Sequence, residues 1–334
     1  SIGFINSITN SAYVRIINNM TGETRKEEIA PLTNYNILTL SQQIINEYST
    51  LSLSNTNVYR TGDFNNSNNS ALIFDLFDNK RTHNIRGNIY QSDSPSFSKI
   101  KGFRGSLDIS ELTGNLRFGV GWSGVDRYYY QNDLGYYNTR NDQRFYGRLR
   151  FQTFNATDKY EKIEGYFFVS ERSRFFPKVL KSVGARIGVD ITTPKLQKIE
   201  FDIDYTSKYK NFDEPRSSDV YIMDPAEYEF QSKFTSDRRK KIQYGFDLRH
   251  SFGINEEFNE KKKNYEIGFG VGIRVNNKLN LEYETGYQTN YDDIGYVFKE
   301  KIDDSNDNIY FGNRNVEAIE NNFSLNYNFD SYMS

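Results

Sequence analysis

The sequence is poor in the residues that most often carry chemistry, and each shortage excludes a class of site. Its 334 residues include no cysteine, which excludes disulfides, thiolate metal sites and cysteine nucleophiles and leaves the redox compartment undetermined. No stretch approaches the roughly 18 consecutive apolar residues of a membrane-spanning helix. The net charge of -2 lacks the basic excess of a nucleic-acid-binding surface, so we expect no nucleic-acid partner.

What the sequence does have is alternation. Residues 265–275 read YEIGFGVGIRV, in which every second side chain is apolar and the residues between are glycine or charged. This period of two is typical of a β-strand with two different faces, and no comparable stretch repeats at helical spacing. Similar patterns predict strands at 33–44, 49–60, 70–78, 82–91, 99–110, 115–125, 143–153, 159–170, 179–192, 198–209, 241–252, 279–291 and 321–330.

The connections between these segments alternate in length. Tight polar turns are followed by long polar stretches, which we expect to be loops at 18–32, 61–69, 92–98, 126–142, 171–178, 210–226, 253–264 and 292–320. Such alternation is the signature of an up-and-down β-barrel. Around 210–240 the alternation of long and short connections holds only if residues 227–235 form one crossing strand. The number of strands is then about sixteen.

The apolar face of 265–275 needs an apolar surrounding. Its eleven residues exceed the five or six of an ordinary strand and match the roughly 9 to 11 tilted residues that cross a bilayer. Aromatic residues make up 16% of the chain, which fits interfacial girdles. We therefore predict an all-β, antiparallel up-and-down transmembrane β-barrel in the outer membrane of a Gram-negative bacterium, in contact with its lipid. A large soluble all-β protein is the alternative.

The stretch LSNTNVYRTGDFNNSNNSALIFDLFDNKRTHNIRGNIYQS at 53–92, with PLTNY at 31–35, NDLGYYNTRND at 132–142 and FSLNYNFDSYMS at 323–334, resembles a Bacteroidetes outer-membrane barrel family of unknown function. Members usually carry a carbohydrate-binding, family-nine-like domain before the barrel. The resemblance implies a location and an architecture, but it implies no catalytic residue. Because the chain begins at Ser1 without a signal peptide, we expect one barrel region over 1–334, incomplete at both ends.

Charged residues on the polar faces are candidates for lining a lumen. They are Arg186, Glu200, Asp202, Asp204 and Arg274. Asp202 and Asp204 share one face at about 7 Å, twice the rise per residue, which would suit paired acid chemistry or a cation. The alternative is lumen charge balanced by Arg186 or Lys208, which would tune permeation.

The tyrosine cluster in DRYYYQNDLGYYN, residues 126–138, is the main candidate for surface binding. Its rings at Tyr128, Tyr129, Tyr130, Tyr136 and Tyr137 could stack on a glycan or anchor a protein partner. The alternative is an aromatic girdle followed by an ordinary outer loop.

Catalytic and metal sites find little support. Ser251 follows His250 directly on a strand, so the two point to opposite faces, and His83 has no clearer partner. Asp303, Asp304 and Asp307 lack the ligand spacing and turn glycine of a calcium loop. We therefore expect no enzyme, no cofactor and no metal.

Two functions follow from these residues. The first is a channel or transport component linked to glycan use, because about sixteen strands leave an aqueous lumen unless something fills it. The second is a plugged barrel that anchors surface carbohydrate- or protein-binding modules. An outer-membrane hydrolase is a weaker third hypothesis.

Overall fold

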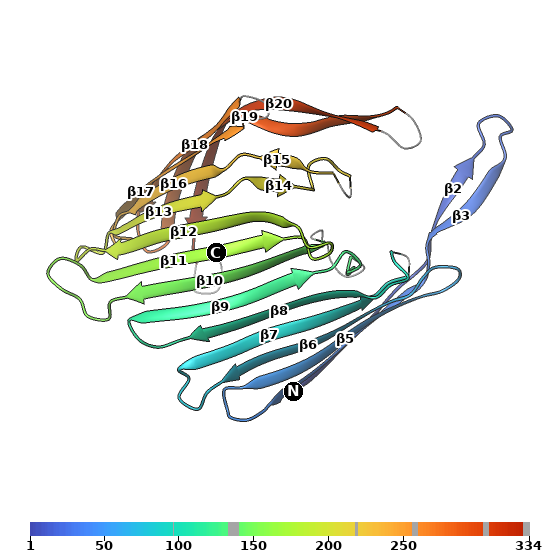
Figure 1. Ribbon diagram of the computed structural model, residues 1–334, viewed down its shortest axis with the longest axis horizontal. Helices are drawn as coiled ribbons and strands as arrows, with labels where there is room; N and C mark the ends of the chain where they lie inside the picture. The colour runs from blue at the N-terminus through green and yellow to red at the C-terminus, as the bar shows by residue number, and fades with distance from the viewer. Residues whose placement is uncertain (96, 133–139, 218–219, 256–259, 303–306, 330–334) are drawn as a thin grey trace. The chain divides into compact units, whose positions relative to one another are not determined.

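The computed structural model describes the chain except for residue 96 and ranges 133–139, 218–219, 256–259, 303–306 and 330–334. Sixteen strands form one antiparallel sheet whose order follows the chain (Figure 1). They are β1 (Ile2–Thr9), β4 (Thr33–Gln43), β5 (Thr50–Arg60), β6 (Ser67–Phe77), β7 (His83–Asp93), β8 (Gly102–Glu111), β9 (Leu116–Val125), β10 (Asp142–Gln152), β11 (Lys162–Ser173), β12 (Leu180–Thr192), β13 (Lys198–Thr206), β16 (Glu227–Thr235), β17 (Ile242–Asn255), β18 (Glu260–Arg274), β19 (Leu279–Lys301) and β20 (Asp307–Tyr327).

Two small hairpins pair outside this sheet. The first joins β2 (Ala12–Ile17) to β3 (Thr24–Ala30), and the second joins β14 (Tyr209–Asn211) to β15 (Ile222–Asp224). Among the described residues there is no helix with the length and hydropathy needed to span a bilayer. The predicted all-β, antiparallel up-and-down architecture with sixteen main strands is confirmed, and residues 227–235 are the single strand β16 that the alternation of connections required.

The chain divides into two compact units. Unit 1 comprises Ser1–Thr113, Gly119–Phe145 and Arg172–Val179, and unit 2 comprises Gly114–Phe118, Tyr146–Glu171 and Leu180–Ser334.

Strand register in unit 2 keeps like side chains on one face. Ile203 of β13 lies opposite Ile187 of β12 on one side and Phe230 of β16 on the other. Two strands further along, Phe269 of β18 lies opposite Phe246 of β17. Since side chains alternate along each strand, every such apolar row is followed by a polar row on the opposite face.

The apolar face is uncovered. Only five hydrophobic residues are buried among the described part of the chain: Val58, Ala71, Val125, Tyr129 and Ile222. By contrast, Ile187 is 56% exposed and Phe269 46% exposed. A water-soluble protein rarely exposes a contiguous apolar surface of more than a few hundred Å², so these rows are built to meet an apolar medium.

Several of the expected outer loops are wrong in part, among them 210–226, which contains β15. Within 292–320, β19 runs on to Lys301 and β20 begins at Asp307, and within 253–264, β17 runs to Asn255 and β18 begins at Glu260. In the extensions of β19 and β20 apolar residues stand in adjacent positions, as at Val297 and Phe298, and not at every second position, so hydrophobic alternation stops where the strands continue. The expected loop 18–32 likewise contains β3.

Candidate functional site

Within unit 2, the polar face of strands β12 to β20 is acidic. The count runs over the paired strands from β12 to β20 and ends at the row formed by Glu227, Gly253 and Lys262. Within these limits the polar face carries eleven carboxylates against six cationic side chains. The carboxylates are Asp190, Glu200, Asp202, Asp204, Glu227, Glu229, Asp247, Glu266, Glu282, Glu284 and Glu320, and the cations are Arg186, Lys198, Lys233, Arg249, Lys262 and Arg274. A solute moving along this face would meet a field that favours cations.

Glycines of β18 make room for three of these acids. Asp247 lies opposite Gly268, Glu284 opposite Gly270, and Glu282 opposite Gly272. A Cβ at Gly268 would overlap the Asp247 carboxylate, and a Cβ at Gly270 would lie 3.6 Å from Cγ of Glu284. The Asp247 carboxylate therefore extends over Gly268, as a larger residue at that position would not allow, while Glu284 reaches ordinary contact distance of Gly270.

The glycine stripe also forms the floor of a groove of about 530 Å³. Its walls carry five carboxylates against two cationic side chains: Asp247, Glu266, Glu282, Glu284 and Glu320 against Lys233 and Arg238. Neither Glu282 nor Glu284 forms an ion pair within the described part of the chain, so these two carboxylates hold uncompensated charge. The alternating glycines of 265–275 thus give an open, anionic surface.

The predicted lumen residues fall into two groups. Arg186 pairs with Asp204, and Asp202 accepts a hydrogen bond from the Tyr166 hydroxyl. Glu200 lies 2.9 Å from Lys198 Nζ. This pairing favours the charge-balance interpretation of Asp202 and Asp204 over acid chemistry. Arg274 lies apart from these four, exposed at the turn end of β18 and opposite Asn280.

In unit 1, a turn after β9 folds onto the polar face of the sheet. The Asp126 carboxylate accepts the backbone N–H groups of Tyr128 and Tyr129 at 2.8 Å each, and that of Phe103 at 2.8 Å. In such an Asx turn, the carboxylate accepts hydrogen bonds from backbone N–H groups that have no carbonyl partner. The N–H of Tyr130 donates to Ser92 Oγ at 3.0 Å, and Ser92 shares the polar side of β7 with Tyr90.

A glycine fixes this inward turn. A Cβ at Gly102 would overlap the backbone of Tyr128 and Tyr129, so the turn lies directly on β8. The tyrosines of this turn consequently differ in exposure and in contacts. Tyr129 is 1% exposed, whereas Tyr130 stacks on Phe97 with centroids 4.9 Å apart. Tyr128 is half-buried, and Tyr136 and Tyr137 lie outside the described residues.

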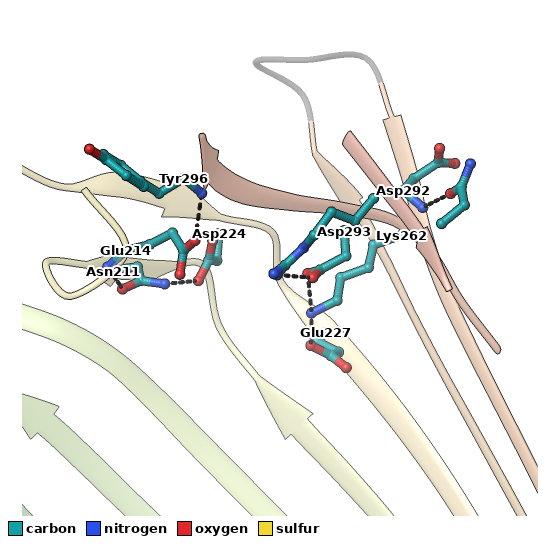
Figure 2. A network of polar contacts seen from close by, with 10 residues as sticks. Asn211, Glu214, Asp224, Glu227, Lys262, Asp292, Asp293 and Tyr296 are labelled. Carbon is teal, nitrogen blue, oxygen red and sulfur yellow. Dashed lines mark hydrogen bonds and ion pairs between the residues drawn. The ribbon is translucent and has the colours of Figure 1, made fainter. Parts of the chain in front are cut away.

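Beyond the membrane-length part of unit 2, polar contacts join the β14–β15 connection to β19, and β18 to β16 and β19 (Figure 2). Glu214 accepts the backbone N–H of Tyr296 at 2.6 Å, and Lys262 lies between Glu227 at 3.5 Å and Asp293 at 3.9 Å. Burial raises the pKa of Asp224, although a hydrogen bond from Asn211 and the charge of Lys262 oppose the shift. Sequence reasoning missed this network because all its members except Glu227 lie in stretches that the sequence predicted to be loops.

The remaining candidates occupy structural positions. His250 stacks on Tyr265 with ring centroids 4.3 Å apart, on the apolar face, while Ser251 is buried on the opposite face. His83 Nδ1 lies 2.9 Å from Thr82 Oγ1. Asp303 and Asp304 lie outside the described residues, and Asp307 pairs with Lys299. Within the described ranges, no cluster of three or more histidine or acidic side chains could hold a metal ion.

A family model described as Domain of unknown function (DUF5916) matches residues 1–334. The chain belongs to this family. The match agrees with the resemblance to a family of unknown function. No curated protein matches the chain significantly.

The chain is similar to several solved structures. An anion-selective porin from Comamonas acidovorans has a TM-score of 0.42 at 9% identity, with 98% of each chain covered. OpdQ of Pseudomonas aeruginosa has a TM-score of 0.43 at 8% identity, covering 96% of this chain and 97% of that one. OpdK of Pseudomonas aeruginosa, solved with vanillate, has a TM-score of 0.42 at 6% identity, covering 97% of each chain.

Proposed function

We propose that the protein is a transmembrane β-barrel channel of a Gram-negative outer membrane, formed as one barrel region over residues 1–334, and that it passes small solutes with a preference for cations. The supporting observation is the pairing of the two faces: one carries exposed apolar rows, and the other is an anionic face over β12 to β20 that includes the groove along β18. Rows of charged side chains set ion preference in channels.

The finer parts of the proposal concern the solute, the source organism and the domain that precedes the barrel. A glycan-related solute, a Bacteroidetes source and a carbohydrate-binding domain before the barrel are what the family resemblance implies, and we include them as proposals. Lipid is then the partner of the apolar rows, and a glycan or protein could be met at the outer loops.

The experiment is conductance of the protein in a planar bilayer under a salt gradient. The wild type should conduct with cations preferred. Replacing Glu282→Gln and Glu284→Gln together should reduce this preference, because both carboxylates lie in the groove without a cationic partner. The matched control is Glu27→Gln with Glu28→Gln in β3, which removes the same charge from outside the main sheet. Absence of conductance, or equal shifts in both double variants, would contradict the proposal.

A plugged barrel that anchors surface modules is the second candidate. The observation that favours it is the turn at 126–131, which occupies space on the polar face of unit 1. An anchor would be silent in the bilayer and would lose binding of a glycan or protein partner in a Tyr128→Ala variant, because this half-buried ring would carry its function.

A further inference from the structure

The inward turn of unit 1 encloses a cavity. The cavity has a volume of about 220 Å³ and lies between the turn and the polar sides of β5, β6 and β7. It has room for about seven waters at roughly 30 Å³ each, and is thus below the roughly 300 Å³ at which pockets for drug-sized ligands begin. Its size suits a molecule of one small ring.

The polar groups of the lining are uncharged. They are the hydroxyls of Ser54, Thr56, Tyr90 and Tyr129 and the amides of Asn69 and Gln131, whereas the Ser70 hydroxyl accepts a hydrogen bond from Asn55 on the opposite face of the sheet. No charged side chain belongs to the lining in the part of the chain that the structure describes. Arg104 stands outside it, with its guanidinium carbon 5.5 Å from the Tyr90 ring centroid. An ionic ligand would leave its charge unpaired here, at a high desolvation cost.

The lining also has apolar surfaces. Ala71 and Ile73 project beside the rings of Tyr90 and Tyr129. Aromatic rings pack well on the C–H faces of a ring that carries hydroxyl groups at its edge. A few placed polar groups among apolar ones is the usual composition of a small-molecule site.

One of the buried polar atoms without a partner in the described part of the chain belongs to the cavity lining. The side-chain oxygen of Asn69 is buried and accepts no hydrogen bond from any described residue. Most buried polar atoms in proteins are hydrogen-bonded, so such an atom calls for an explanation. A hydroxyl donated by a ligand in the cavity would supply the missing bond.

We propose that the cavity between the 126–131 turn and β5–β7 binds a neutral polyhydroxylated ring, of the size of a monosaccharide. The site deepens the proposed function, on which it rests for the route of entry, because it would hold a solute at the polar face. Binding itself needs no conduction, so the two proposals can fail separately.

The test is saturation-transfer NMR with the full chain in detergent micelles. Glucose, galactose and xylose are the neutral probes, and gluconate and glucosamine are the charged ones. At least one neutral sugar should receive saturation and bind more tightly than both charged probes. Thr56→Val and Asn69→Leu should each weaken that binding about threefold to tenfold, as expected for loss of one hydrogen bond.

Two variants separate the site from general damage. Thr206→Val makes the same substitution on the polar side of β13, outside the cavity, and should leave binding unchanged. Gly102→Ala leaves every lining side chain in place but displaces the turn, and should abolish binding in protein that remains folded. No transfer to any neutral sugar, tighter binding of a charged probe, or equal binding by the wild type and both cavity variants would overturn the proposal.

Discussion

Val271 and Gln243 lie in adjacent rows on opposite faces of the sheet, so the same substitution should affect stability differently at the two positions. Val271 of β18 lies opposite Tyr244 on the apolar face, and Gln243 lies opposite Gly272 one row away on the polar face. Val271→Arg should lower the free energy of unfolding by about 2 to 4 kcal/mol, because a lipid-facing arginine near the midplane must be desolvated. Gln243→Arg should change it far less, since the new charge would enter an anionic groove. Denaturant titration in lipid vesicles measures both, and equal losses would contradict a lipid-facing surface.

The lowered pKa of Asp237, a turn residue, predicts how stability depends on pH. In the connection between β16 and β17, hydrogen bonds from the Arg239 guanidinium and backbone lower the pKa of Asp237 to about 2, from an ordinary 3.8. Because the folded pKa is depressed, this contribution to stability is present above pH 3.8 and is lost as the pH falls towards 2. Arg239→Ala should return the pKa towards 3.8 in an NMR titration, whereas Arg238→Ala should leave it low. A low value in both variants would assign the shift to another cause.

At the scale of elements, hydrophobic alternation predicted those parts of the strands that have one apolar and one polar face. It located residues 227–235 as β16 in a difficult region. It missed the outer parts of β19 and β20 because their apolar residues stand in adjacent positions, as at Val297 and Phe298, so no period of two marks these parts as strands. The turn at 126–131 was expected to be an exposed loop, and its inward fold depends on a contact with Gly102 that is distant in the sequence.

Cysteine labelling tests which connections share an end of the sheet. The protein has no native cysteine, so each introduced thiol reports alone. Asp63→Cys lies in the connection from β5 to β6, and Asn276→Cys in the tight turn from β18 to β19. Long connections should be extracellular and short ones periplasmic, so a membrane-impermeant maleimide should label Asp63→Cys on intact cells and Asn276→Cys only after lysis. Labelling of both on intact cells would rule out this topology.

For the whole molecule, two pairs of carboxylates should affect permeation differently. Asp204 is paired with Arg186, and Asp202 accepts a hydrogen bond from Tyr166, whereas Glu282 and Glu284 have no cationic partner in the described part of the chain. Replacing Asp202→Asn and Asp204→Asn removes two negative charges and also releases a guanidinium. Reversal potentials should therefore shift further towards anions than with Glu282→Gln and Glu284→Gln. A smaller shift would show that Asp202 and Asp204 do not face the permeation path.

The register of β19 predicts where the strand can accept insertions and deletions during evolution. From Leu279 to Asn290 its pairing with β20 runs without a break, and breaks occur only further out, between Asn290 and Asp293 and between Tyr296 and Phe298. A one-codon deletion in the unbroken part would turn every following side chain to the other face and place glutamates in lipid. The same deletion past Asn290 would fall where the ladder already slips. Length variation among natural sequences should therefore be confined to the outer segment, while the inner segment changes by substitution alone.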